Sequence, residues 1–356
     1  MFHTVELFKE ISSNEYYNLD RALMKISKKL KTKYYKDNKI EKIALCFSGE
    51  GIVIVLKKFI TEKYNYYKIV LRINPKRLIK NKEYIEVVNE DDLQSIKEEF
   101  RKTMTILIEE YDGNLPFIYH NIDNYSVERI DYCYNVHYKE SKNILELIRR
   151  GDIPNRFEPY LKYDKVSKRK LMPKNSFYLV GKGVTINIYS KYEHLNNDNH
   201  FSGIDKTKAL GIIRFELQCS AQKVNNIKNS INAKNKSFST MASKKISEKI
   251  LVYYLEKTIG LGNYYTLKLA RKIINEESSL QENTKKEMIE ILNLISKKRS
   301  LPEARKNYSG KEHKLNILLK KIQKLGINPV TIPINWQIDY LPNPYMKFIN
   351  RTYAEI

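Results

Sequence analysis

Cysteines and long apolar runs are scarce in this 356-residue sequence, and each scarcity excludes a class of protein. The three cysteines, Cys46, Cys133 and Cys219, are odd in number and widely spaced. They fit neither a disulfide framework nor a zinc site, so we expect a reducing cytoplasmic setting. No apolar stretch is long enough to span a bilayer, and the first six residues lack the features of a signal peptide. We therefore expect no membrane association.

Acidic residues are too few to balance the basic ones. The sequence has 64 Lys and Arg against 41 Asp and Glu, which gives a formal net charge of +23. The basic residues form short clusters spread along the chain, at 28–36, 76–82, 165–170 and 297–299. An AT-rich genome would explain the many lysines, but it leaves the imbalance of charge unexplained. The imbalance therefore indicates a folded surface that neutralises phosphates of a nucleic acid.

The first third of the sequence mixes helical and strand-like patterns. We predict a helix over 5–36, two strands over 40–47 and 51–57 joined by a Ser-Gly-Glu turn, and a strand over 66–73. Asn89, followed by an acidic turn, predicts the start of a helix over 90–111.

The rest of the sequence divides into a strand-rich and a helical part. Strand patterns at 127–136, 184–191 and 210–218 precede a polar segment, 221–243, that resembles a boundary. Helical patterns follow at 244–258, 264–275, 284–297 and 313–325, before a Pro-rich end. We therefore predict an α+β protein with an antiparallel sheet core and packed helices, followed by a mainly helical C-terminal region. The expected divisions are an N-terminal α+β region at 1–118, a central sheet at 119–235 and the helical region at 236–356.

The three middle strands can each be divided into an apolar and a polar face, because side chains alternate along a strand. If the strands share a sheet, their polar faces gather six side chains on one surface: Arg129, Asp131, Tyr189, Lys191, Arg214 and Glu216. An ordinary solvated sheet face with ion pairs explains this pattern at least as well. The functional interpretation is phosphoryl transfer, in which carboxylates hold a divalent ion and cations stabilise charge on a phosphate.

These polar faces lie in segments that resemble a known family. The segments 127–131 (VERID), 186–191 (INIYSK) and 213–216 (IRFE) occur in the order seen in the phage and plasmid replication initiators typified by the filamentous-phage gene II protein. Residues 67–78 and 326–333, followed by Trp336 and Asp339, resemble further segments of that family. The resemblance covers most of the chain and implies a nickase-like palm built on the sheet.

The resemblance also implies a reaction, which is the nicking of one strand at an origin to start rolling-circle replication. A tyrosine oxygen attacks a backbone phosphate and forms a 5′-phosphotyrosyl link, and the freed 3′-hydroxyl primes a polymerase. Mg²⁺ or Mn²⁺ would polarise the phosphate. Carried over by position, Asp131 and Glu216 are the expected metal carboxylates, and Lys191 and Arg214 are the cations near the phosphate.

The third metal ligand departs from the family pattern. The phage protein has an acid three residues after the lysine, whereas this sequence has Glu193 two residues after Lys191 and His194 three after. Both residues stay candidates, although a single histidine in a polar segment is more often an ordinary surface residue. No His-x-His pair is present. Oxygen ligands favour Mg²⁺ or Mn²⁺ over Zn²⁺.

The attacking tyrosine is harder to choose among 27 tyrosines. In related nickases a helix presents the tyrosine to the sheet, so we select Tyr253 and Tyr254, which lie in the predicted helix 244–258. Successive helical residues point about 100° apart, so one of the two would face a site. For either residue taken singly, aromatic packing in the core of an amphipathic helix is the more common explanation. Tyr189, and a second pair at 264–265, are the alternatives.

The resemblance implies partners. These are origin DNA, both as supercoiled duplex and as single strand, with a host helicase and polymerase, because the sequence has no phosphate-binding loop of the Gly-x-x-x-x-Gly-Lys-Ser/Thr type. The oligomeric state stays open, with a homodimer as one option. Two other functions fit the same charge and fold class: a non-enzymatic initiator or repressor that binds origin sites, and a related relaxase or transposase.

Overall fold

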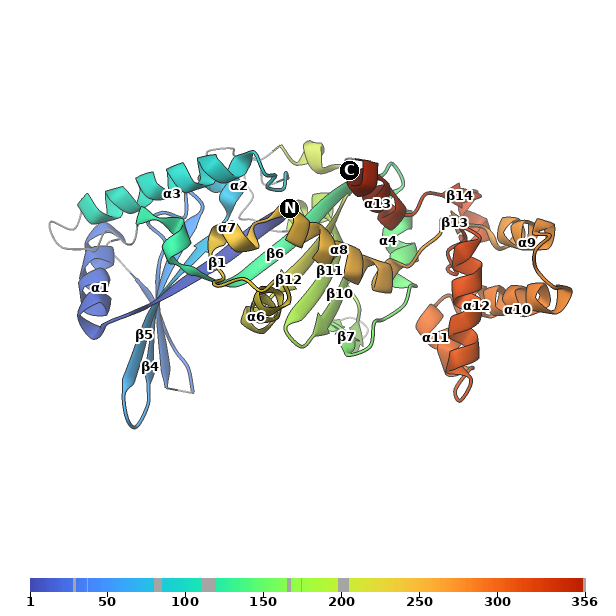
Figure 1. Cartoon of the computed structure of the whole chain (residues 1–356), viewed down its shortest axis with the longest axis horizontal. Coiled ribbons are helices and arrows are strands. Elements are labelled where there is room, and N and C mark those ends of the chain that lie inside the picture. Colours follow the sequence, from blue (N-terminus) through green and yellow to red (C-terminus); the bar gives the residue numbers. More distant parts are fainter. Residues whose placement is uncertain are drawn as a thin grey trace.

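The fold is organised by one large antiparallel sheet (Figure 1). The computed structural model describes residues 1–27, 30–36, 38–79, 85–109, 120–164, 168–173, 175–197 and 205–354. Ten strands follow one another in the order β2-β3-β4-β5-β1-β6-β12-β11-β10-β7, and every neighbouring pair is antiparallel. The strands are β1 (Phe2–Ile11), β2 (Lys31–Tyr34), β3 (Lys39–Ala44), β4 (Ile52–Ile60), β5 (Asn65–Ile73), β6 (Ser126–His137), β7 (Phe157–Pro159), β10 (Ser176–Gly181), β11 (Val184–Ser190) and β12 (Ile212–Cys219).

The predicted class, α+β with an antiparallel sheet and a helical C-terminal region, is confirmed. The strands predicted over 40–47, 51–57 and 66–73 correspond to β3, β4 and β5, and the three middle strands correspond to β6, β11 and β12. The helix α3 (Asp92–Glu109) starts where Asn89 predicted it. There the Asn89 backbone amide donates to the Asp92 carboxylate at 2.9 Å, and the Asp92 backbone amide donates to the Asn89 side-chain oxygen at 3.1 Å. The predicted residues 110–111 lie outside the described residues, as do parts of the basic clusters at 28–36, 76–82 and 165–170.

The prediction of one helix over 5–36 is wrong. Residues 2–11 form β1, which lies between β5 and β6 near the middle of the sheet, and the helix is limited to α1 (Ser13–Ser27). The switch occurs at Ser12, whose hydroxyl accepts from the Glu15 amide while the Glu15 carboxylate accepts from the Ser12 amide. This reciprocal capping fixes the start of the helix and so ends the strand.

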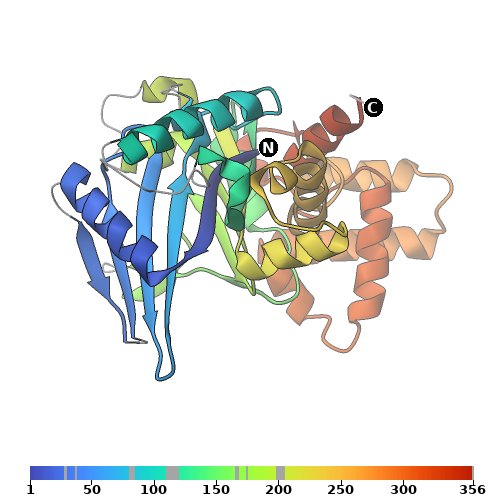
Figure 2. The same cartoon turned by 60° about the vertical axis from the view of Figure 1, so that its left-hand side comes forward.

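Helices cover one face of the sheet (Figure 2). Buried side chains of α1, α3, α4 (Ser141–Arg149), α6 (Ala221–Ser230) and α8 (Lys244–Ile259) form one hydrophobic cluster with the apolar faces of the strands. The shorter helices α2 (Pro75–Leu78), α5 (Lys191–Asn197) and α7 (Phe238–Met241) lie at the ends of strands or between longer helices. The segment 221–243, expected as a boundary between the strand-rich and the helical parts, contains α6 and α7.

A second hydrophobic cluster lies in the C-terminal helices, at one end of the molecule (Figure 1). It is formed mainly by α9 (Leu267–Glu276), α10 (Glu282–Lys298), α11 (Leu301–Lys306) and α12 (Glu312–Lys324). These agree with the predicted helical patterns, except that α11 was not predicted and residues 264–265 form the strand β13 (Tyr264–Tyr265) instead of a helix start. The ion pair of Arg305 with Asp152 (2.5 Å) joins this cluster to the loop after α4. The chain closes with β14 (Tyr340–Leu341), which pairs with β13, and with α13 (Pro344–Ala354), which was not predicted.

No helix in the described part of the chain is long and apolar enough to cross a membrane.

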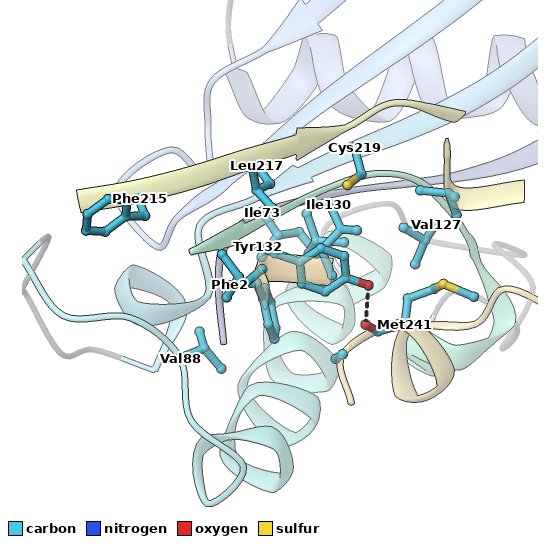
Figure 3. Close-up of a cluster of buried hydrophobic side chains, with 14 of the residues drawn as sticks. Phe2, Ile73, Val88, Val127, Ile130, Tyr132, Phe215, Leu217, Cys219 and Met241 are labelled. Atoms are coloured by element: carbon cyan, nitrogen blue, oxygen red, sulfur yellow. Dashed lines mark hydrogen bonds between the residues drawn. The ribbon is translucent and has the colours of Figure 1, made fainter. Parts of the chain in front are cut away.

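The core between the sheet and its helices holds one buried polar contact that spans distant parts of the sequence (Figure 3). Tyr132 is fully buried, and its hydroxyl donates a hydrogen bond of 2.8 Å to the backbone carbonyl of Met241 at the end of α7. Its ring lies among Phe2, Ile130 and Leu217.

We expect Tyr132→Phe to lower the free energy of unfolding by about 1–2 kcal/mol, because the Met241 carbonyl loses its buried donor while the ring still fills the core. Chemical denaturation of the variant and of the control Tyr34→Phe, whose side chain is exposed in the natural chain, measures this. An equal unfolding free energy for both variants would contradict the importance of the contact.

Candidate active site on the open sheet face

The register of four strands places polar side chains together on the face that the large helices do not cover. Glu216 on β12 lies opposite Asn187 on β11, and Asn187 lies opposite Tyr178 on β10. On the other side of β12, Gln218 pairs with Asp131 on β6. The apolar residues of the same strands belong to the core cluster. We call this polar surface, defined by Asp131, Glu216, Asn187 and Tyr178, the open face. The predicted division of β6, β11 and β12 into apolar and polar faces is therefore confirmed.

Two carboxylates lie at the centre of the open face. Asp131 accepts two hydrogen bonds from the guanidinium of Arg129, at 2.8 and 2.9 Å. Glu216 accepts from the Tyr189 hydroxyl at 3.0 Å and from the Gln218 amide at 2.8 Å. Burial raises the pKa of Asp131 to about 7. Arg129 acts against this rise and the nearby Glu216 carboxylate adds to it. The two carboxylates are thus close enough to repel each other.

Two buried cations lie beside these carboxylates. Arg214 is fully buried and donates to the Asn135 side chain at 2.9 Å and to the Ile85 carbonyl. Lys191, predicted as the end of a strand, is instead the first residue of α5 and is 1% exposed. Burial lowers the pKa of Lys191 to about 7, and Arg214 lowers it further whereas Glu216 raises it. His3 lies close to both cations, and its pKa is lowered by burial and then by their charges.

The two candidates for a third metal ligand lie on α5. Glu193 is within 4.0 Å of the Lys142 ammonium and accepts a hydrogen bond of 3.5 Å from Asn175. The ring of His194 lies 5.1 Å from the ring of Tyr189, centroid to centroid. No group of three or more His, Cys, Asp or Glu side chains in the described residues is arranged to hold a metal ion. The structure therefore brings His194 near the cluster, but it does not bring Glu193 and His194 together with the two carboxylates as a set of ligands.

The open face does offer a third oxygen atom. The Asn187 side-chain oxygen is buried and has no hydrogen-bond partner among the described residues, and Asn187 lies directly opposite Glu216. A buried acceptor without a donor is costly unless a cation or a donor satisfies it. Two carboxylates and an amide oxygen are the ligand types that hard divalent ions such as Mg²⁺ and Mn²⁺ prefer. The donor chemistry of the open face thus fits a divalent ion.

Tyr253 and Tyr254 lie on the other face of the sheet from the carboxylates. Their helix α8 packs into the core cluster, and Tyr254 is buried there against Phe157. Tyr253 is half exposed, and its hydroxyl accepts a hydrogen bond of 2.6 Å from Lys257, which lowers the pKa of that tyrosine. The helix therefore does not present either tyrosine to Asp131 or Glu216, in contrast to the arrangement expected from the resemblance.

Three residues of the open face were not selected from the sequence. His3 lies in a segment that was predicted as helix. Tyr178 lies in β10, which was not predicted. A short turn of Lys182 and Gly183 joins β10 to β11, and the glycine has a φ of 82°. Asn187 was assigned to the correct face but given no role. The strand alternation and the turn glycine were the signals that could have found Tyr178 and Asn187.

The open face continues into a depression of about 860 Å³ beside the carboxylates. Tyr178, Asn187 and Tyr189 belong to both the open face and the lining of this depression. The depression therefore reaches the site through these three side chains, because Asp131, Glu216, Lys191 and Arg214 do not line it.

Comparison with known proteins gives one structural similarity. No protein-family model matches the chain, and no curated protein matches its sequence. The chain is similar to the structure of a rolling circle replication initiator protein from Geobacillus stearothermophilus. The two share 8% sequence identity, with 72% of this chain and 84% of that chain covered and a TM-score of 0.35. A similarity of this size assigns neither a family nor an activity to the chain.

We expect Lys191→Met to stabilise the protein more at about pH 7 than at about pH 10. In the unfolded chain Lys191 keeps its proton up to about pH 10.4. In the folded chain the buried Lys191 loses its proton above about pH 7. The charged and titratable groups near it are Arg214, Glu216, Cys133 and His3. The free energy of unfolding of the natural protein therefore rises with pH between about pH 7 and pH 10, by up to about 1.4 kcal/mol per pH unit relative to that of Lys191→Met. Unfolding free energies at several pH values measure this. Lys297 is exposed, so the unfolding free energies of the control Lys297→Met and of the natural protein should differ by the same amount at every pH. A difference that is equally constant with pH for Lys191→Met would contradict the prediction.

Proposed function

We propose that this protein is a replication initiator that binds origin DNA and nicks one strand by tyrosine transesterification on the open face. The observation that carries the proposal is the burial of four charged side chains next to an accessible depression, which is lined by the cross-strand neighbours of Glu216 and Arg214, namely Asn187 and Tyr189. Asp131, Lys191, Arg214 and Glu216 are each at most 6% exposed. Burying ionised groups is expensive, and such clusters are more common at functional sites than in ordinary sheets. The net charge of +23 and the family resemblance of the same segments support DNA as the substrate.

We assign the attacking oxygen to Tyr178. Its side chain is partly buried and lines the depression. Burial raises the pKa of Tyr178; the charge of Arg129 lowers it, whereas those of Glu216 and Asp131 raise it. Tyr189 is the nearest alternative, but it is 6% exposed and its hydroxyl already donates to Glu216. Tyr253 and Tyr254 stay candidates only if α8 moves relative to the sheet.

The reaction distributes charge in a way that suits these residues. The Tyr178 oxygen forms a bond to phosphorus while the bond from phosphorus to the 3′-oxygen breaks, and the phosphodiester is retained as a 5′-phosphotyrosyl link. The phenolic proton passes to solvent in the depression that Tyr178 lines. Lys191 can supply a proton to the leaving 3′-oxygen, and Arg214 adds positive charge beside it.

A divalent ion belongs to the proposal as a ligand of the carboxylates. Asp131, Glu216 and the Asn187 side-chain oxygen would hold Mg²⁺ or Mn²⁺. Such an ion polarises a phosphate oxygen and offsets its negative charge. Hydrogen bonds from Arg129 and Gln218 keep the two carboxylates oriented, as hydrogen bonds to the ligands do at other metal sites. Host helicase and polymerase would complete replication.

Nicking of supercoiled plasmid that carries the replicon origin tests the function. With Mg²⁺ or Mn²⁺ the natural protein should produce open circles with covalently attached protein. Tyr178→Phe should abolish the attachment, and Asp131→Asn and Glu216→Gln should reduce nicking by about 100-fold or more while origin binding persists. Tyr253→Phe and Tyr254→Phe should nick normally.

Mass spectrometry of the DNA-linked peptide identifies the attacking residue directly. A link at Tyr189, Tyr253 or Tyr254 would show that the assignment of Tyr178 is wrong. Tight origin binding without nicking in either metal would instead favour a non-enzymatic initiator.

Metal binding can be measured without DNA by titrating Mn²⁺ and recording the electron paramagnetic resonance signal of the free ion. Glu216→Gln and Asn187→Leu should each weaken Mn²⁺ binding by about tenfold or more, because each removes one oxygen ligand. Glu158→Gln removes an exposed carboxylate on β7 and serves as the control. Equal Mn²⁺ affinity for all three variants would exclude a site at these oxygens.

A further inference from the structure

The depression beside the carboxylates has a lining unlike that of a metal site. Most of its residues are aromatic or carry a hydroxyl or an amide, and most are uncharged: Tyr160, Lys162, Pro173, Asn175, Ser176, Tyr178, Val180, Thr185, Asn187, Tyr189, Ser190, His194 and Asn197. Its volume of about 860 Å³ lies in the usual range for ligand clefts, roughly 300–1,000 Å³. The combination of ring faces with amides and hydroxyls suits a flat, polar-edged ligand such as a nucleobase.

Tyr160 is the aromatic residue of this lining that is most open to a ligand. It is 49% exposed and sits directly after β7, where its backbone amide donates a hydrogen bond of 2.8 Å to the Tyr178 carbonyl. The rings of Tyr160 and Tyr178 meet edge to face, with centroids 5.3 Å apart. An exposed tyrosine ring held at the rim of a cleft provides a surface on which a base can stack.

Positive charge is concentrated beside this rim. The small hairpin of β8 (Lys162–Asp164) and β9 (Arg169–Leu171) begins at Lys162, which lines the depression, and its far end leads to Pro173, which also lines it. Lys162, Lys168 and Lys170 are exposed and form no ion pair with any residue that the structure describes. Unpaired lysines at the rim of an aromatic cleft complement the charge of a phosphate backbone.

We infer that this depression binds an unstacked base of single-stranded DNA, stacked on Tyr160, with the adjoining backbone directed along the β8–β9 hairpin. The inference deepens the proposed function and depends on it for the identity of the ligand. Tyr178 and Asn187 are shared by the depression and the open face, so a base held against Tyr160 would lie beside Tyr178, to which the attacking oxygen is assigned. Single-stranded DNA is favoured over duplex because a base must leave the helical stack to enter the cleft.

The test uses the full chain in EDTA, so that binding is measured without cleavage. The probes are fluorescein-labelled oligo(dT) of about 12 nucleotides and an abasic deoxyribose-phosphate oligomer of the same length and charge. Tyr160→Leu should weaken oligo(dT) binding by about tenfold, which corresponds to the loss of one stacked base, and should leave binding of the abasic oligomer unchanged. Tyr160→Phe keeps the ring and should bind oligo(dT) within about twofold of the natural protein.

A matched control separates the cleft from general aromatic contact. Tyr163 is exposed on β8 of the same hairpin but does not line the depression, so Tyr163→Leu should not change oligo(dT) affinity. Equal losses for Tyr163→Leu and Tyr160→Leu, or an equal loss of abasic binding for Tyr160→Leu, would overturn the inference. Circular dichroism of each variant confirms that the affinity change is not caused by unfolding.

The hairpin lysines give a second measurement on the same proteins. Lys162→Gln should weaken oligo(dT) and abasic binding to the same extent and reduce the slope of log affinity against log salt by about 0.7, because one phosphate contact is lost. An unchanged salt slope for Lys162→Gln would show that the DNA backbone does not contact the hairpin at Lys162. Because neither probe is cleaved, selective loss of base binding by Tyr160→Leu supports the cleft even if origin nicking fails. Conversely, if the natural protein nicks origin DNA but Tyr160→Leu binds oligo(dT) normally, the proposed function is supported and base binding in the depression is not.

Discussion

The open face depends on the register of β12 between β6 and β11. Glu216 faces Asn187 on one side of it and Cys133 on the other, and Arg214 faces Tyr189 and Asn135. A slip of one residue would exchange the two faces of β12, moving Phe215 and Leu217 to the open side and forcing Arg214 and Glu216 into the apolar core. The apolar side of β12, packed under the helices, therefore fixes the position of every charge on its polar side.

The charges around that polar side combine one ion pair, between Arg129 and Asp131, with three further buried charges, on Lys191, Arg214 and Glu216. Arg129 neutralises Asp131, whereas Glu216 is held by the neutral donors Tyr189 and Gln218 and faces the two buried cations across the site. The result is a cluster in which Asp131 and Lys191 both have pKa values of about 7. Groups in this range change protonation with small changes in their surroundings, which is the property required of side chains that take up or release protons during a reaction. An ordinary sheet face gains nothing from such an arrangement, because pairing on a solvated surface stabilises it little.

The sequence predicted the parts of the site that depend on local alternation and missed those that depend on packing. β6, β11 and β12 have clear period-two patterns, so Asp131, Arg214 and Glu216 were placed on one surface correctly. The segment 5–11 was misread because its apolar residues at 5, 7, 8 and 11 also fit a helical spacing, and short apolar runs are ambiguous. The amphipathic pattern of α8 shows that one side of it is buried, but it cannot show which face of the sheet it packs on. The burial of Arg214 beneath Ile85 likewise joins residues 129 positions apart, which no local pattern encodes.

The hairpin of β10 and β11 limits where this chain can change in length. Tyr178 and Asn187 are direct cross-strand partners, and only Lys182 and Gly183 separate the two strands. A single residue added within either strand would turn Tyr178 or Asn187 toward the core, whereas residues added between Gly181 and Val184 leave both in place. Alignments of distant relatives should therefore place their gaps at this turn, and insertions made by design, such as an epitope or a labelling site, belong there.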